Sequence, residues 1–521
     1  MASKNIANHK TIMEFIDNLL NRITMYRLML YYLLALLGVA AIFGALGILP
    51  YSPLAILLSA AIILAVCWAM NSFFAWSFNV PANAESFYIT AFILALIITP
   101  ISLKPFNAAS FWFLVLASVF AMTSKYIVAI NKKHIFNPAA FAVAATALTF
   151  NQYASWWVGG NLPLLAFVLI GGLLIARKIQ RFDLVLTFFV TAIVSIIATN
   201  ASFNPFTTAE KAIIHTTILF FGFVMLTEPL TTPPTRSLRI TYGALVGLLF
   251  SPAVHIGPIY STPELALIAG NIFSWLVSPK SKYSLTLISK TEVGKNIYDF
   301  AFIMPQKINF SPGQYMEFTL PPDGADLRGN RRYFTIASSP TEPDLRLGVK
   351  FYGDDEKSIR RSMFKKKMLL LKSGETIMAG QRAGDFTLPK DASRKLVFIA
   401  GGIGITPFRS MIKYLSDGAT NQTGGNHPDI VLLYANKTKA EVAYREIFDE
   451  AARTIGLKTI YITSEENLRI DATLIQHEIH DWRERIFYIS GPHEMVEAFR
   501  KTLRSLGVSR ANIKTDFFPG F

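Results

Sequence analysis

The chain has 521 residues, a formal net charge of +15 and a mean hydropathy of +0.37. Residues 1–278 hold 14 lysines and arginines and 7 acidic residues, whereas residues 279–521 hold 36 and 28, so a membrane-like half precedes a half with the composition of a soluble protein. The single cysteine, Cys67, excludes internal disulfides and cysteine-ligated zinc or iron–sulfur centres built by this chain alone.

Residues 1–24 are predicted to form an amphipathic helix at the cytosolic surface. Apolar side chains recur at helical spacing on one face of this segment: Ile12, Phe15, Ile16, Leu19, Leu20 and Ile23. Such a helix is typical of the membrane interface, and a helix that binds a partner protein is the alternative.

Residues 25–278 are predicted to form an α-helical membrane domain with ten spans, since one span needs about 20 apolar residues. Lysine and arginine precede the first span and follow spans four, six, eight and ten, whereas the opposite loops hold only Lys104 and Lys211. The positive-inside rule then places both termini in the cytosol of a multi-pass protein of the cell (inner or cytoplasmic) membrane. The ten segments are 27–49, 53–78, 86–103, 106–130, 135–158, 161–176, 183–203, 207–227, 239–258 and 262–278.

Two segments on the predicted cytosolic side carry proline at membrane depth: residues 132–141 (KKHIFNPAAF) and 225–236 (MLTEPLTTPPTR). Irregular backbone is tolerated there only where protein buries it or where it lines a cavity. A stiff turn between spans eight and nine is the alternative interpretation of the second segment. The helix that follows it contains Tyr-Gly-Ala-Leu-x-Gly-Leu-Leu at 242–249.

These segments resemble the D subunit of Rnf-type ferredoxin:NAD reductases and the B subunit of the sodium-pumping NADH:quinone reductase, over most of residues 20–278. The resemblance implies ten spans and flavins within the membrane. The family's covalent FMN site, a Ser-Gly-Ala-Thr-like loop, is replaced here by Val-Gly-Gly-Asn at 158–161, so no covalent FMN is expected at that loop. A second, non-covalent flavin (FMN or riboflavin) is expected near Asn137, Glu228, Thr231, Thr232 and Thr235, where the family usually has Asp in place of Glu228.

Residues 279–392 are predicted to form an antiparallel β-barrel, because strand-like runs recur at 283–288, 298–304 and 314–320. Within this region, 332–340 (RYFTIASSP) resembles the Arg-x-Tyr-Ser/Thr signature by which the ferredoxin–NADP reductase family binds FAD. The resemblance assigns Arg332 to the pyrophosphate, Phe334, in the Tyr position, to the ring, and a catalytic hydroxyl near flavin N5 to Thr335. Tyr333 is a further cofactor-binding candidate. Ser362, at a predicted helix start, suits a phosphate. Without the family, the segment is simply a strand.

Residues 393–521 are predicted to form an α/β domain with a parallel sheet that binds NAD(P)H. An apolar strand at 395–400 leads into a glycine-rich turn and a helix at 407–415, an arrangement that lets a dinucleotide approach the backbone and places its pyrophosphate at the helix start. The motif Ser490-Gly491-Pro492 follows a second strand in the same way. These two motifs resemble the nicotinamide half of the same reductases, and the candidate residues are Gly401, Gly402, Gly404, Thr406, Pro407, Gly491, Pro492 and Met495.

Two further features bear on the chemistry. Ser490 stands where the family usually has a catalytic Cys beside the hydride path, and Phe521 either covers the flavin ring or docks the C-terminus. The acidic stretch Thr463-Ser464-Glu465-Glu466 replaces the Ser-Arg pair that holds the 2′-phosphate in NADPH users. Acidic side chains repel a phosphate, so NADH is favoured, with NADPH as the alternative.

The predicted protein is a membrane flavoprotein that passes electrons from cytosolic NAD(P)H through FAD to a membrane flavin and on to an extracytosolic flavoprotein. Reduction of a membrane quinone is the alternative acceptor reaction. A haem reductase needs paired histidines, whereas only His134, His215 and His255 lie near spans. A transporter gated by a redox-sensing flavodomain is the alternative of another class, although the spans hold almost no acidic residue besides Glu228. No metal site and no nucleic-acid partner are expected.

Overall fold

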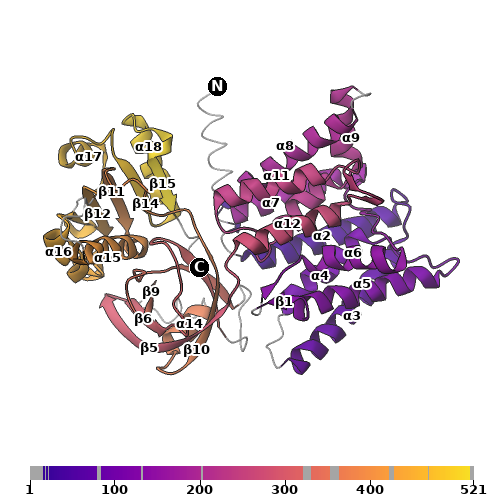
Figure 1. Cartoon of the computed structure of the whole chain (residues 1–521), viewed down its shortest axis with the longest axis horizontal. Coiled ribbons are helices and arrows are strands. Elements are labelled where there is room, and N and C mark those ends of the chain that lie inside the picture. The colour runs from indigo at the N-terminus through magenta and orange to yellow at the C-terminus, as the bar shows by residue number, and fades with distance from the viewer. Residues whose placement is uncertain are drawn as a thin grey trace. The chain divides into compact units, whose positions relative to one another are not determined.

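The computed structural model contains two compact units, residues Met1–Ser281 and Lys282–Phe521 (Figure 1). The predicted amphipathic segment lies almost wholly outside the residues that the structure describes, as do Ser362 and Phe521. The described residues are 16–17, 19–20, 23–78, 84–130, 133–200, 204–320, 330–351, 363–421, 428–466 and 469–516.

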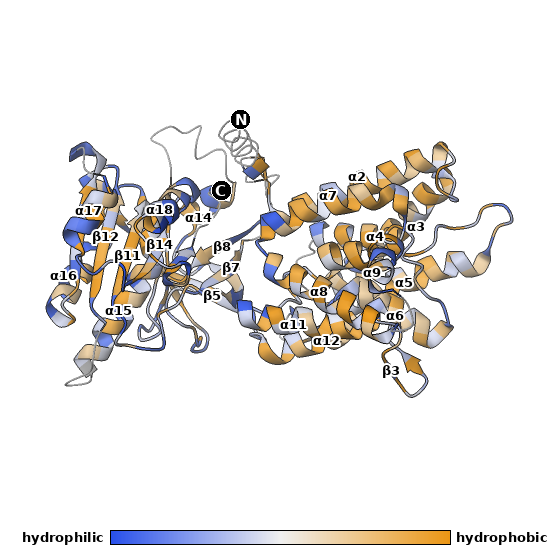
Figure 2. Ribbon diagram, turned by 90° about the horizontal axis from the view of Figure 1, so that it is seen from above, coloured by the Kyte–Doolittle hydropathy of each residue, from blue (hydrophilic) through white to orange (hydrophobic). Residues whose placement is uncertain are grey.

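The first unit is a bundle of apolar helices (Figure 2). Among the described residues, five helices are long and apolar enough to cross a membrane: α2 (Met25–Ala45), α3 (Pro53–Ser77), α5 (Ala108–Tyr126), α7 (Leu162–Ile179) and α8 (Phe182–Thr199). A sixth candidate is a broken span that starts with α9 (Pro205–His215) and continues, after a bend of 67°, through residues Ile218–Met225. The second part comprises α10 (Ile218–Phe220) and the π-helical η1 (Phe221–Met225).

The other four predicted spans contain shorter helices of 13 to 15 residues: α4 (Ala84–Ile97), α6 (Pro138–Phe150), α11 (Arg236–Leu249) and α12 (Pro263–Val277). A helix of 14 residues rises about 21 Å, less than the roughly 30 Å of a bilayer core. All ten predicted segments are therefore helical in part, and a complete crossing by each of the ten remains a prediction.

The order of elements in this unit repeats. Two helices, a short or broken helix, a further helix, a β-hairpin and a short helix occur first as α2 to α6, with the hairpin β1 (Ala129–Ile130) and β2 (Lys133–His134). The same order recurs as α7 to α12, with the hairpin β3 (His255–Ile256) and β4 (Ile259–Tyr260). The last helix of each half begins with a capping residue and a proline, Asn137-Pro138 and Thr262-Pro263. Broken helices in two matching halves are typical of membrane proteins that bind ligands at the interface between the halves.

Glycines explain the close packing of α8 and α11. A Cβ at Gly243 would lie 2.8 Å from the carbonyl oxygen of Leu184, and one at Gly247 would overlap the Thr191 hydroxyl. This small-xxx-small spacing lets two membrane helices approach closely. Arg239 of α11 also pairs with Asp183 of α8 at 2.7 Å, with only about a tenth of either side chain exposed.

We expect Gly247→Leu to destabilise the helical unit, because the added side chain must displace backbone of α8. Overpacking of this kind costs about 1–3 kcal/mol or more. Thermal unfolding of the purified full chain in detergent should show a lower midpoint than the wild type. The control is Gly38→Leu in α2, where a Cβ meets nothing within 4 Å; an unchanged midpoint for Gly247→Leu would contradict the proposed packing.

The second unit begins with a six-stranded antiparallel sheet in the order β8-β7-β10-β5-β6-β9. Its edges approach each other after β8, where the N–H of Ala337 donates to the carbonyl of Arg346 at 2.8 Å. Closure into the predicted barrel remains a prediction. Apolar side chains of all six strands, together with helix α14 (Met363–Leu370), form one core. The strands are β5 (Tyr283–Gly294), β6 (Ile297–Ile303), β7 (Tyr315–Thr319), β8 (Arg331–Thr335), β9 (Leu345–Lys350) and β10 (Thr376–Ala383).

A five-stranded parallel sheet follows, in the order β13-β12-β11-β14-β15, as the sequence predicted. Alternate residues of its central strands pack into two separate clusters, so helices cover both faces (Figure 1). The elements are β11 (Leu396–Gly401), α15 (Thr406–Asn421), β12 (Ile430–Asn436), α16 (Arg445–Thr454), β13 (Lys458–Thr463), α17 (Ala472–Glu478), β14 (Ile486–Ser490), α18 (His493–Ser505) and β15 (Ile513–Asp516).

Candidate functional site

The two glycine-rich turns of the parallel sheet lie against each other at the carboxyl ends of β11 and β14, the edge where such sheets bind ligands. A Cβ at Gly401 would overlap Met495 and lie 3.2 Å from Pro492 Cδ. One at Gly404 would overlap the carbonyl of Ser490, and one at Gly491 would lie 2.5 Å from Met495 Cε. These three glycines therefore allow the turns to pack, and Met495 fills the space between them.

Gly402 has a different environment. Its φ of +53° is left-handed, and a Cβ built there meets nothing within 4 Å, so this residue faces open space. The short 3-10 turn Gly402–Ile405 then leads into α15, which starts at Thr406 and Pro407. Free backbone N–H groups at a helix start attract phosphate, so a dinucleotide would pass Gly402 toward α15.

Ser490 is buried in the central part of the same edge. It lies beside Ala400 of β11 on one side and beside Asp516 of β15 on the other. The Oδ2 atom of Asp516 is buried and has no hydrogen-bond partner in the part of the chain that the structure describes. The sequence analysis missed Asp516; the available signal was an acidic residue that ends the last strand directly before an aromatic tail.

Burial raises the pKa of Asp516 to about 7, whereas an unfolded aspartate titrates near 3.9. Because the folded state keeps a proton that the unfolded state releases, the free energy of unfolding should fall by about 4 kcal/mol as the pH rises from about 4 to about 7. The melting temperature of the second unit, followed by flavin fluorescence in the full chain, should fall over this window. Asp516→Asn should remove that component of the pH dependence; an unaltered slope would contradict the assignment.

The carboxyl ends of β12 and β13 carry polar groups. Asn436 at the end of β12 is buried, and both of its side-chain amide atoms are closed off from solvent. Glu466 pairs with Lys439 at 2.5 Å and accepts a hydrogen bond from Thr463 at 2.7 Å. This pairing offsets one of the two acidic charges that were expected to repel a 2′-phosphate, so the NADH preference rests on Glu465 and stays a prediction.

The FAD signature lies on β8. Strand alternation places Arg332 and Phe334 on one face and Tyr333 and Thr335 on the other. The Arg332 guanidinium stacks 5.2 Å from the Phe364 ring in the first turn of α14, and the Phe334 ring lies 5.9 Å from the same ring. The strand therefore meets the start of α14, directly after the undescribed Ser362. A buried guanidinium beside a helix start fits the pyrophosphate of FAD.

The opposite face of β8 carries the groups expected near the flavin ring. The Tyr333 hydroxyl donates to Gln381 Oε1 at 2.9 Å, and its ring lies edge-on to Tyr315 at 5.6 Å. Thr335 is buried and pairs with Tyr315 across the sheet. Phe334 was expected to offer its face to the isoalloxazine; the structure instead packs it between Phe318 and Phe364, so Tyr333 is the aromatic residue that shares the face of Thr335.

A buried polar network joins the antiparallel sheet to the parallel sheet within the second unit. Arg409 of α15 donates to Glu342 at 2.8 Å and to the carbonyl of Ala337 at 3.0 Å. The Tyr444 hydroxyl donates to Asp299 at 2.8 Å, and burial together with this carboxylate raises the pKa of Tyr444 well above its ordinary value.

Glycine again allows close approach at this junction, because a Cβ at Gly348 of β9 would lie 2.6 Å from both Thr406 Cγ2 and the Tyr444 hydroxyl. These contacts hold the start of α15, after the turn at Gly402, against the antiparallel sheet. Sequence analysis did not find them, since the partners lie far apart in the chain.

In the helical unit, three of the predicted membrane-flavin residues, Glu228, Thr231 and Thr232, form a hydrogen-bonded cluster with His134. Glu228 accepts hydrogen bonds from Thr231 and Thr232 and pairs with His134 at 3.2 Å. Asn137 caps α6, since its Oδ1 accepts a hydrogen bond from the N–H of Ala139 at 3.1 Å. Its own backbone N–H donates to Asn271 Oδ1 of α12 at 2.8 Å.

The other predicted residues lie outside this cluster, and Thr235 precedes α11 without forming a capping hydrogen bond. The sequence analysis did not assign His134, which pairs with Glu228, or Asn271, which holds Asn137. The side chain of Glu228 remains 22% exposed, which leaves one accessible edge of the cluster.

Comparisons with known proteins find an NAD-binding family model within the second unit and relatives that are oxidoreductases. The family model for the oxidoreductase NAD-binding domain matches residues 398–501. Stachydrine N-demethylase reductase subunit Stc4 of Rhizobium meliloti is 26% identical over 246 residues, which cover 45% of this chain and 66% of that protein. Oxidoreductase NAD-binding domain-containing protein 1 of Bos taurus is 29% identical, covering 40% of this chain and 72% of that protein. The cytochrome b5 reductase domain of Ulva prolifera nitrate reductase aligns with a TM-score of 0.40 and 20% identity, over 46% of this chain and 98% of that one.

Residues 398–501 of the second unit thus match an oxidoreductase NAD-binding domain, and the known proteins that are similar to this chain include oxidoreductases. The resemblance of the helical unit to membrane reductase subunits is not shown by these comparisons.

Proposed function

We propose that this protein is a membrane flavoprotein that moves electrons from cytosolic NADH, through FAD in the second unit, to a flavin in the helical unit and on to an extracytosolic flavoprotein. The observation that carries the proposal is the continuity of the chain: α12 ends at Val277 and β5, the first strand of the reductase unit, starts at Tyr283. A reductase joined so closely to a bundle of apolar helices has its electron acceptor within the same polypeptide.

The residues of the second unit supply binding and orientation. Arg332 and the start of α14 hold the pyrophosphate of FAD, which when bound accepts two electrons together and releases them singly. The open backbone at Gly402 admits the nicotinamide dinucleotide, and Ser490 and Thr335 line the path of the hydride. The Arg409–Glu342 and Tyr444–Asp299 contacts keep the two sheets at the separation that this transfer requires.

In the helical unit, we assign a non-covalent flavin to the cluster around Glu228. A carboxylate, an imidazole and two hydroxyls match the polar edge of an isoalloxazine, which carries both a donor and acceptors. The exposed edge of Glu228 is the side from which this flavin would be held. Ten complete spans with both termini in the cytosol belong to the same proposal, and a membrane quinone is the alternative acceptor.

Cofactor extraction tests the assignment of two flavins. Acid treatment of the purified full chain, followed by mass analysis, should release FAD together with FMN or riboflavin in equal amounts. Glu228→Ala should lower the yield of the second flavin and leave FAD unchanged. If FAD is the only flavin released, the proposed flavin in the helical unit is wrong. A Soret band in the visible spectrum would indicate that haem carries electrons there instead.

A further inference from the structure

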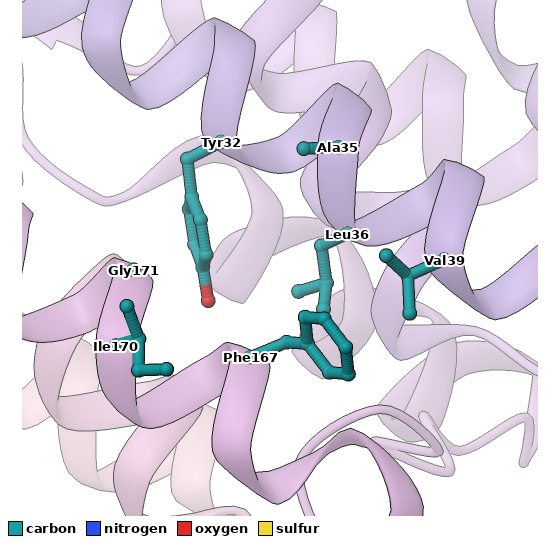
Figure 3. A pocket seen from close by; sticks show the side chains of 7 residues that line it. All are labelled: Tyr32, Ala35, Leu36, Val39, Phe167, Ile170 and Gly171. Carbon is teal, nitrogen blue, oxygen red and sulfur yellow. The ribbon is translucent and has the colours of Figure 1, made fainter.

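Large apolar side chains that stay exposed are common in the helical unit and rare in the second unit. In the helical unit they include Phe167 and Ile170, which border a groove between α2 and α7 (Figure 3), and hydrocarbon is the surrounding expected for them. Among the described residues of the second unit there are four: Ile288, Ile303, Leu370 and Tyr414. The first three lie at one end of the antiparallel sheet and are called the apolar patch below.

Strands β5 and β6 place two members of the apolar patch on the outer face of the sheet. Leu287 and Phe302 are partners across these strands, and both are buried in the core. Side chains alternate along a strand, so Ile303, one residue after Phe302, points away from the core and is 54% exposed. The register shifts directly after Leu287, and this bulge leaves Ile288 exposed beside it.

The loop after α14 brings Leu370 to the same end of the sheet. The Ser373 hydroxyl donates to the carbonyl of Ile288 at 2.8 Å, and the N–H of Gly374 donates to the carbonyl of Leu287 at 2.9 Å. Leu370 precedes Ser373 by three residues, so it lies within about 10 Å of this contact. Its side chain is 63% exposed. The apolar patch is therefore continuous over two strands and a helix end.

Lysines surround the apolar patch. Lys366 precedes Leu370 by four residues on α14, so the two exposed side chains share one face of the helix. Lys372 is exposed in the loop that follows, and Lys290 Nζ donates to a main-chain carbonyl at the end of α14 at 2.5 Å. The same loop holds one acidic side chain, Glu375. Three positive charges thus stand against one negative charge.

This composition fits a bilayer with anionic headgroups better than a protein partner. An exposed apolar patch marks either kind of contact. Protein interfaces are enriched in aromatic residues and arginine and depleted of lysine, whereas this surface combines aliphatic side chains with lysines. Aliphatic groups that enter the boundary between headgroups and acyl chains, together with lysines that meet lipid phosphates, are the pattern of interfacial membrane binding.

The chain also supplies the bilayer. Residues between Val277, the end of α12, and Tyr283, the start of β5, can extend over at most about 20 Å. A membrane that holds α12 therefore keeps the second unit at its surface, at a high effective concentration, so that weak lipid contacts suffice for docking.

We propose that the apolar patch docks the second unit on anionic phospholipid, with Ile288, Ile303 and Leu370 entering the headgroup boundary and Lys366 and Lys372 contacting lipid phosphates. This docking goes beyond the electron transfer proposed above. It rests only on the helical unit lying in a membrane.

A fluorescent probe on the apolar patch tests the docking in the full chain in lipid nanodiscs. Cys67 is fully buried, so a cysteine introduced at the surface is the one that a thiol-reactive bimane labels. Ile303→Cys and Leu370→Cys each place the probe in the patch, so that one variant suffices if the other fails to fold. Tyr414→Cys is the matched control, because this side chain of α15 is 41% exposed and lies outside the patch. A doxyl group on the lipid acyl chain quenches from the bilayer, and iodide quenches from water.

In nanodiscs that contain phosphatidylglycerol, doxyl lipid should quench the probes at positions 303 and 370, whereas iodide should quench the probe at position 414. Replacing phosphatidylglycerol by phosphatidylcholine should weaken the quenching by doxyl lipid. Lys366→Gln combined with Lys372→Gln should lower the ratio of docked to undocked protein about 25-fold, since each lysine near an anionic surface contributes about five-fold.

The proposal is overturned if doxyl lipid quenches positions 303 and 414 equally, or if quenching at 303 is unchanged without anionic lipid and without the two lysines. A probe at position 303 that neither doxyl lipid nor iodide reaches would show that protein covers the apolar patch, which also overturns the proposal.

Discussion

Arg332→Ala is expected to purify with little FAD and to have no measurable NADH oxidation. The substitution removes a buried guanidinium that stacks on Phe364, and with it charge-assisted hydrogen bonds to a pyrophosphate of about 1.5–3 kcal/mol each. The loss of one such bond weakens FAD binding about 10- to 150-fold. Flavin content per chain, measured by absorbance after gel filtration, checks the result.

The matched control is Arg331→Ala, on the opposite face of the same strand, where the side chain lies 3.8 Å from Glu317. This variant should keep its FAD. Arg332→Lys retains the charge without the two-pronged geometry and should give an intermediate affinity. A full complement of FAD and normal turnover in Arg332→Ala would show that β8 is not the FAD strand.

Gly402→Val is expected to bind FAD normally and to lose reduction by NADH by a factor of at least about 100. A branched side chain at φ +53° is strained, and it would occupy the open space through which the dinucleotide approaches. Stopped-flow reduction by NADH should be slow, whereas dithionite should still reduce the flavin.

Gly374→Val controls for strain alone. Gly374 also has a left-handed φ, of +88°, and a Cβ there also meets nothing within 4 Å, but it lies in the turn before β10. Its reduction by NADH should match that of the wild type. If Gly402→Val is reduced as fast as Gly374→Val, the dinucleotide does not pass this turn.

Features that depend on residues close together in the chain could be located from the sequence alone. The parallel sheet was predictable because its central strands are apolar runs, two of which, β11 and β14, lead into glycine-containing turns. The same spacing identified Gly402, but it could not separate it from Gly401 and Gly404, which serve packing. That distinction depends on residues such as Met495 and Ser490, which reach the turn from another strand.

Features that depend on long-range contacts were not predictable. Tyr444 and Asp299 are 145 residues apart and become neighbours only when the two sheets pack. In the helical unit, hydropathy located the described helices but gave most of the segments more residues than the helices have. It does not register where Asn137-Pro138 starts a helix or where Thr216 adopts an extended conformation and breaks one. The repeat in the helical unit, α2 to α6 and α7 to α12, was not predicted, because it is a repeat in the order of helices and hairpins.

The central claim is that electrons cross the membrane within one polypeptide. Sealed proteoliposomes with the reductase unit outward and ferricyanide trapped inside test it most directly, with residues 281–521 alone as the control. NADH added outside should reduce the trapped ferricyanide through the full chain, whereas the shorter chain should reduce only dyes added outside. If the trapped ferricyanide stays oxidised while the full chain oxidises NADH with an external dye, transmembrane electron transfer is contradicted.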